Sequence, residues 1–195
     1  MKYLKILGLV AVAASALTAF TGISSATTLT SPKWTVVGVG EIIHAATPAG
    51  THAVLDSPIG KIECNMTIQG KVTNAGGGAP TQSVEASVEH FSMTGCTGSA
   101  VYVPNFGSFK ITSSGGGKGV LTATGTEVTI ETFGLHCIYS TSGTPMGTVT
   151  GGSPASIAIS ATIPRTGGKS GAFCGSTAPL TGGFVITNPN PAYID

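Results

Sequence analysis

The sequence predicts an all-β protein: one antiparallel β-sandwich or barrel-like domain that follows a cleaved signal peptide. Three observations lead to this prediction. Residues 61–72 alternate strictly between polar and apolar or small side chains, as a half-buried strand requires. Other short β-prone runs, separated by Gly and Pro turns, lie along the chain, a pattern typical of sandwiches and barrels. After residue 26 no apolar pattern recurs at helical spacing over three turns.

Residues 1–26 have the order of a secretory signal peptide. Lys2 and Lys5 precede an apolar run over residues 6–20, and the small residues Ser24 and Ala26 fit the −3 and −1 positions of a cleavage site. A membrane anchor is the alternative, but the run is shorter than the ~20 residues that span a bilayer. We therefore expect a mature domain over 27–195 without a membrane span, exported to the periplasm, the cell surface or the medium.

The strand over residues 61–72 is the best-defined element of that domain. Its even positions are apolar or small, so Cys64 lies on the dry face. The Gly-rich residues 74–80 then form a turn, because glycine tolerates the positive φ that chain reversals need. The strand over 83–93 returns, and its apolar phase slips near Glu89–His90, which predicts a β-bulge.

Short β-like runs on both sides of this hairpin complete the expected domain. Gly and Pro residues mark the breaks between them. The expected strands are one or two within 27–46, then 52–55, 101–103, 106–112, 119–124, 127–133, 135–139, 148–149, 156–163, 171–174 and 184–187.

All four cysteines follow residue 26. An even number in an exported chain predicts two disulfides with three possible connectivities, and free buried thiols are the alternative. Cys64 and Cys137 each precede a Gly-rich turn and then a second cysteine, so the two halves resemble related antiparallel excursions whose ends meet. This favours Cys64–Cys96 and Cys137–Cys174, unless the likeness of these Gly/Thr-rich halves is a coincidence.

The composition is poor in charge. Only 9% of the residues are charged, against ~25% in ordinary soluble domains. Residues 1–26 carry two lysines and no acidic residue, so their removal changes the formal net charge from +1 to −1. Nucleic-acid binding needs clustered Lys and Arg, so it is not expected. A hydroxyl-rich surface with little charge suits an extracellular or self-associating protein.

No motif in the chain predicts catalysis, a cofactor or a metal. The mature part has two aspartates, no nucleophile elbow and no pair of carboxylates at a characteristic spacing. It also has no H-x-H, H-x-x-x-H or C-x-x-C motif and no calcium loop. We therefore expect no catalytic, cofactor-binding or metal-binding residues and no enzymatic activity.

Two apolar, β-prone segments near the ends of the mature chain are candidates for a ligand or assembly surface. Their residues are Trp34, Val36 and Ile42 in the first segment and Phe184 and Ile186 in the second. Neither segment carries the charge that usually protects an edge strand. They could pair with each other or with the body of the domain, or one could add to the sheet of another molecule.

The chain resembles a loose group of exported bacterial proteins with four cysteines, which is similar to the activator-of-alkane-oxidation proteins of pseudomonads. The likeness lies in ECNMTIQGKVT at 63–73, TGCTGS at 94–99, GTVTGG at 147–152, CGS at 174–176 and the Pro-containing tail at 189–193. It implies a non-catalytic exported protein of the cell surface or biofilm that helps cells meet apolar substrates. It brings no catalytic residues.

These observations favour a secreted, non-enzymatic component of the cell surface or extracellular matrix that acts by contact, with itself or matrix components as partners. The alternative is an extracellular module that binds a glycan or an apolar, alkane-like molecule. Aromatic platforms for sugars are sparse, because Trp34 is the only Trp, whereas an interior cavity lined by Met and Ile would suit an apolar guest. A cavity large enough for a ligand therefore favours the binding module, and a solid core favours the contact role.

Overall fold

The computed structural model describes residues 27–31, 35–77, 82–132, 134–166 and 172–195. Within these ranges the only helical element is one 3-10 turn, η1 (Ala172–Cys174), and all other elements are strands. The predicted all-β class is confirmed. The expected signal peptide and Trp34 lie outside the described residues.

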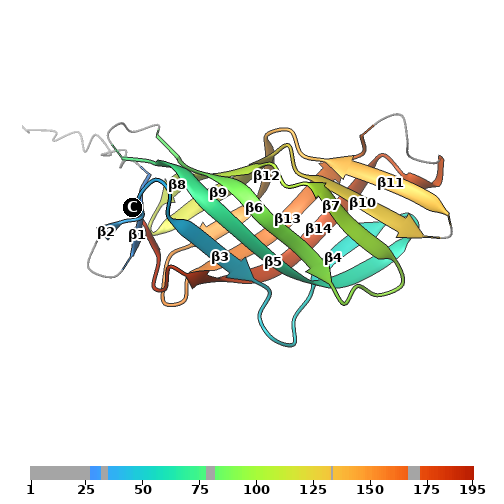
Figure 1. The fold of residues 1–195 in the computed structure, drawn as a ribbon, viewed down its shortest axis with the longest axis horizontal. Coiled ribbons are helices and arrows are strands. Elements are labelled where there is room, and N and C mark those ends of the chain that lie inside the picture. Colours follow the sequence, from blue (N-terminus) through green and yellow to red (C-terminus); the bar gives the residue numbers. More distant parts are fainter. Residues whose placement is uncertain (1–26, 32–34, 78–81, 133, 167–171) are drawn as a thin grey trace, which may run out of the picture.

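The main body is a closed antiparallel barrel with eight strand positions (Figure 1). One position is shared by two short strands, β3 (Ile42–Ala46) and β4 (Ala53–Ser57), which pair with β5 (Gly60–Ala75) on one side and β14 (Thr177–Asn188) on the other. Pairing of β13 (Ser156–Pro164) with β14 closes the barrel. In order around it are β13 (Ser156–Pro164), β12 (Thr144–Thr150), β9 (Lys118–Thr124), β8 (Ser108–Gly115), β6 (Val84–Thr94), β5 (Gly60–Ala75), β3 (Ile42–Ala46) with β4 (Ala53–Ser57), and β14 (Thr177–Asn188).

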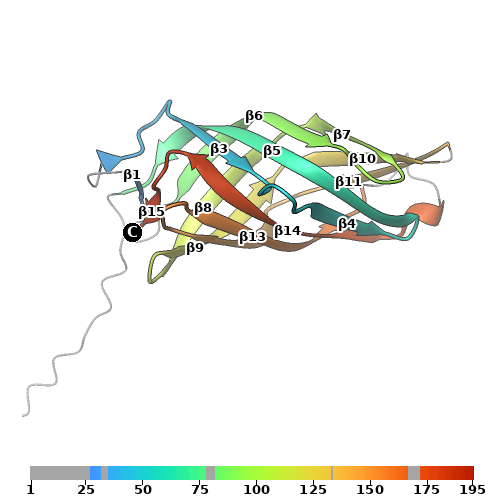
Figure 2. The ribbon, with the colours of Figure 1, turned by 90° about the horizontal axis from the view of Figure 1, so that it is seen from below.

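Two small antiparallel sheets lie at opposite ends of the barrel (Figures 1 and 2). At one end β1 (Leu29–Ser31) runs between β15 (Tyr193–Ile194) and β2 (Thr35–Val36). At the other end β10 (Glu127–Thr132) runs between β11 (Leu135–Ser140) and β7 (Ala100–Asn105).

The alternation in the sequence sets which side chains face the interior. Along β13 the buried residues are Ile157, Ile159, Ala161 and Ile163, and the residues between them are exposed. In β5 the even positions from Ile62 to Val72 face inward, as predicted. The predicted β-bulge in β6 is also present: Gln69 pairs with His90 and Gly70 with Val88, so Glu89 is the extra residue.

Several of the expected elements differ in extent, and one differs in type. The strand expected over 148–149 is β12 (Thr144–Thr150), the strand expected over 52–55 is β4 (Ala53–Ser57), and the first two residues of the turn expected over 74–80 belong to β5. Residues 172–174 form η1 and not a strand. The strand expected over 184–187 begins at Thr177, because Pro179 and Gly182–Gly183 are incorporated in β14. Gly182 is needed there, since a Cβ atom would lie 3.0 Å from the Cα of Ala53 on β4.

Both predicted disulfides are present, and both lie toward the end of the barrel that carries β10 and β11. Cys64–Cys96 joins the part of β5 that pairs with β4 to the chain after β6, and Cys137–Cys174 joins β11 to η1. The hydroxyl group of Tyr139, a fully buried residue of β11, donates a hydrogen bond to the carbonyl oxygen of Cys174. Burial raises the pKa of Tyr139, and the nearby Arg165 opposes this with a smaller effect.

Replacing Tyr139 with Phe is expected to lower the free energy of unfolding by about 1–3 kcal/mol, because the Cys174 carbonyl loses this donor. The raised pKa of Tyr139 means that the fold favours the neutral phenol. This stabilisation is complete below the unfolded-state pKa of about 10 and is lost as the pH rises through the higher folded-state value. Urea unfolding of the wild type and the Tyr139→Phe variant at pH 7 and above pH 10 measures the difference in their free energies of unfolding. A difference that does not shrink at the higher pH would contradict the stabilisation by a neutral Tyr139 phenol.

Candidate functional site: an apolar cavity inside the barrel

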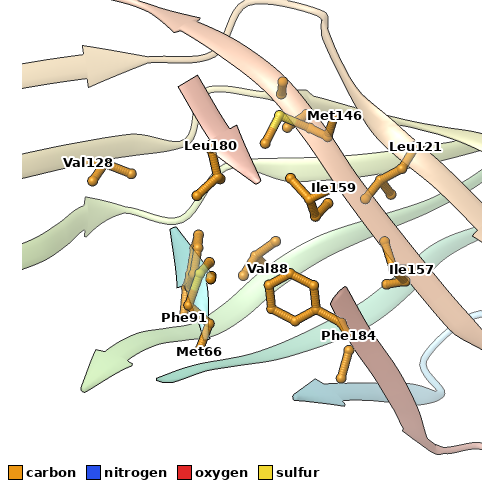
Figure 3. Close-up of a cluster of buried hydrophobic side chains, with 14 of the residues drawn as sticks. Met66, Val88, Phe91, Leu121, Val128, Met146, Ile157, Ile159, Leu180 and Phe184 are labelled. Carbon is orange, nitrogen blue, oxygen red and sulfur yellow. The ribbon is translucent and has the colours of Figure 1, made fainter. Parts of the chain in front are cut away.

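The barrel encloses a cavity of about 90 Å³ that is lined by inward-facing side chains from every strand position. Figure 3 shows part of this interior, with Val88 and Phe184 near the centre and Met66, Met146 and Ile159 around them. Almost all lining residues are aliphatic side chains, Met or Phe. Several of them are only half-buried although they lie on the inward rows, because they border the cavity: Ile43, Ile68, Met93, Phe109 and Ile111.

Small residues on neighbouring strands explain why the interior is not filled. Gly70 on β5 lies beside Ala86 on β6, and a Cβ atom added to Gly70 would be 3.4 Å from the Cβ of Ala86. Ala86 pairs with Phe109 on β8, which pairs in turn with Ala123 on β9. Barrels of eight strands can be filled by side chains or can hold one small ligand. Gly70, Ala86 and Ala123 are small residues at neighbouring positions of the barrel wall, and they leave room for a small ligand.

No side chain that the structure describes offers the cavity a free hydrogen-bond donor. Among the described residues that line it, only Thr126 and Thr141 are polar. Thr126 Oγ1 donates to the carbonyl oxygen of Phe106 at 2.8 Å, and Thr141 Oγ1 accepts from Thr126 N at 3.0 Å and donates to Thr126 O at 3.4 Å. Both hydroxyl protons are therefore used by the backbone, and a guest finds an apolar wall.

Three methionines line the cavity, and they are all the methionines of the chain other than Met1: Met66, Met93 and Met146. Methionine has an unbranched side chain and a polarizable sulfur, so it adapts to guests of different shape. Met146 is placed by a bulge in β12, where Pro145 pairs with Thr122 and Gly147 with Leu121.

The expected surface residues lie in different environments. Val36 on β2 is 46% exposed, and Ile42 on β3 is half-buried. Phe184 and Ile186 are buried and line the cavity, so they form no external surface. The two terminal segments pair with each other through β3 and β14, and β14 has neighbours on both edges.

The cavity-lining set as a whole was not predicted from the sequence. Individual signals exist: small residues replace large ones on inward rows at Gly70 and Ala86, and methionines occur at Met66 and Met93 on inward rows. However, only the register between strands shows that these positions meet across one space.

The titratable groups of the described residues lie outside this cavity. His136 Nδ1 is 2.8 Å from Glu131 Oε1 across β10 and β11, and both side chains are substantially exposed. Lys61 Nζ is 2.9 Å from Glu63 Oε1, and the hydrogen bond between them raises the pKa of Lys61 and lowers the pKa of Glu63. Exposed pairs of this kind contribute little to stability.

Two features are absent from the described residues. They contain no group of three or more His, Cys, Asp or Glu side chains placed to hold a metal ion. Among the described residues, no helix is long and apolar enough to cross a membrane.

Comparison with known proteins finds no matching family model, no matching curated protein and no matching solved structure.

Proposed function

We propose that the protein is a non-enzymatic binding module that holds a small, wholly apolar molecule inside the barrel. The observation that carries this proposal is the cavity, because it is enclosed by strands and lined almost entirely by apolar atoms. Apolar cavities of this kind stay dry and accept hydrophobic guests. Of the two functions expected from the sequence, an interior space favours the binding module over a role by surface contact alone.

The lining favours a hydrocarbon over a glycan. A sugar presents many hydroxyl groups, and burying each one without a partner costs about 1–3 kcal/mol in proteins. The hydroxyl groups of Thr126 and Thr141 are already bonded to the backbone. A guest with no hydrogen-bonding group avoids this cost and gains from the removal of its apolar surface from water.

The size of the cavity sets the scale of the guest. Its volume of about 90 Å³ is below the ~150 Å³ of an engineered protein cavity that binds benzene. Short hydrocarbons are therefore the expected class, and a guest of the size of hexane, which is larger than benzene, requires Met66, Met93 or Met146 to change rotamer.

Titration with three molecules of equal chain length, hexane, 1-hexanol and hexanoate, tests this proposal. We expect saturable binding of hexane, with 1-hexanol at least about tenfold weaker because its hydroxyl group loses water and finds no hydrogen-bond donor among the lining side chains. Hexanoate is expected to bind most weakly, since a buried unpaired carboxylate costs still more. Equal binding of all three molecules, or no binding of hexane, would refute the proposal.

Filling the cavity should abolish binding without unfolding the protein. Replacing Ala86 with Leu extends a side chain into the space beside Gly70, and we expect hexane affinity to fall by about tenfold or more. The matched control is Ser87→Leu, whose side chain lies on the opposite face of the same strand. Calorimetric titration of both variants measures the effect; full affinity in the folded Ala86→Leu variant would show that hexane binds elsewhere.

The place of action that we propose is outside the cytoplasm. Two disulfides agree with an oxidising environment, and the expected cleavage after Ala26 would release the domain there. Mass spectrometry of protein recovered from washed cells, periplasm and medium tests this: we expect a chain beginning at Thr27 with both bridges formed. A full-length chain with reduced thiols in the cytoplasm would contradict it.

A further inference from the structure

The strand β1 closes one end of the cavity. Leu29, its first residue, is 1% exposed and is one of the residues that line the cavity. Figure 2 shows β1 and β15 at the end of the barrel opposite to β10 and β11. Any guest that leaves by this end must pass Leu29.

This closure depends on a few short contacts. Leu29 pairs with Ile194 and Thr30 with Tyr193, but β15 and β2, the two strands beside β1, are each two residues long and neither belongs to the barrel sheet.

The residues just before β1 are held more firmly: Thr27 Oγ1 accepts from Ser113 N at 2.7 Å, Thr27 O accepts from Gly77 N at 3.1 Å, and Thr27 N donates to Gln82 O at 3.3 Å. Thr28 exchanges two backbone hydrogen bonds with Asp195. The movable part is therefore β1 itself, beyond this anchored pair. Segments with few hydrogen bonds and short ladders open locally at a lower free energy than the body of a domain.

The opposite end is fastened much more strongly. The strand β10 pairs with β11 over six residue pairs, and Cys137–Cys174 ties β11 to the chain that leads into β14. Tyr139 adds its buried hydrogen bond to Cys174. Opening this end would break a covalently fixed and well-paired sheet.

We propose that the apolar guest enters and leaves past Leu29, with β1 acting as a lid that swings away from the barrel. This inference rests on the proposed function, because a lid has a role only if the cavity takes a guest. The lid controls the rate of exchange and the cavity wall controls the affinity. Opening separates β1 from β15 and exposes Leu29, while the disulfide-bonded end stays closed.

A matched pair of truncations tests the direction of passage. Leu29 and Ile130 are both fully buried, but Ile130 lies on β10 at the opposite end of the barrel and is not among the residues that line the cavity. Changing either residue to Ala removes the same number of carbon atoms. We expect Leu29→Ala to release hexane about tenfold faster, and Ile130→Ala to leave the release rate within about twofold, as measured by NMR exchange.

A reversible lock provides the second arm. Thr30 and Tyr193 are directly opposite in an antiparallel pair, where a Cα separation of about 4.5–5.5 Å lies within disulfide range. The oxidised variant Thr30→Cys/Tyr193→Cys should release hexane at least about tenfold more slowly than the same variant with its two new thiols alkylated.

The outcomes separate the lid from the binding function. Saturable binding with release rates that respond to neither Leu29→Ala nor the lock would overturn the lid and leave the binding module standing. Faster release from Ile130→Ala than from Leu29→Ala would place the exit route at the other end of the barrel. Absence of any hexane binding by the wild-type protein would overturn both proposals.

Discussion

Gly147→Ala is expected to lower the free energy of unfolding by about 4 kcal/mol or more, which is enough to prevent folding of many domains. Gly147 lies in β12 between Leu121 and Ile159, with φ of +153°. A Cβ atom at this position would be 1.9 Å from the carbonyl oxygen of Ala158 on β13. Since that atom belongs to the backbone of a strand paired on both sides, β13 has to move and the barrel wall opens.

Gly183→Ala is the control for this prediction. Gly183 lies in β14 and pairs with the same Ala158 from the other side, but nothing lies within 4 Å of an added Cβ. We expect its free energy of unfolding to change by no more than about 1 kcal/mol. A small increase would follow from the lower entropy of Ala in the unfolded chain. Urea unfolding followed by circular dichroism measures both variants. Equal stability of Gly147→Ala and wild type would mean that β12 and β13 do not pair in this register.

Removal of the Cys137–Cys174 bridge is the second large expected effect. Both cysteines are fully buried, and they are separated by 37 residues. Closing a loop of this length restricts the unfolded chain by about 3–4 kcal/mol in the chain-entropy model. Replacement of both residues by Ala should lower the free energy of unfolding by about this amount, since Ala leaves no polar atom in the buried site.

The Cys64–Cys96 pair is the comparison, because its loop of 32 residues is nearly as long. A similar loss of unfolding free energy on removal of the Cys64–Cys96 bridge would indicate that loop closure accounts for most of the stabilisation by both bridges. We expect the Cys137–Cys174 variant also to lose the bond from Tyr139 to Cys174, which would make its loss the larger one. A change below about 1 kcal/mol in either double variant would contradict a structural role for that bridge.

Local patterns predicted several features of this fold correctly. The two-residue alternation places Cys64 inside β5, and the phase slip at Glu89–His90 gives the bulge in β6. The Gly-rich excursion between each pair of cysteines identifies both bridges. Each of these features depends on neighbours in sequence or on one reversal of the chain.

Features that depend on distant segments were not predictable in this way. Closure of the barrel needs β13 beside β14 in one register. The first half of β14 contains Pro179 and Gly182, and these residues do not predict a strand. The cavity depends on Gly70 and Ala86 meeting on adjacent strands. No local pattern distinguishes an inward Ala that leaves a space from one that packs tightly.

The central claim is that the barrel interior binds a wholly apolar guest, and methionine-methyl NMR tests it most directly. Met66, Met93 and Met146 all line the cavity, so ¹³C-methyl labelling of methionine places three probes around the guest. Titration with hexane is predicted to shift all three signals in a saturable way, and the Ala86→Leu variant should suppress these shifts. Methyl signals that stay unchanged when the solution is saturated with hexane would contradict the claim.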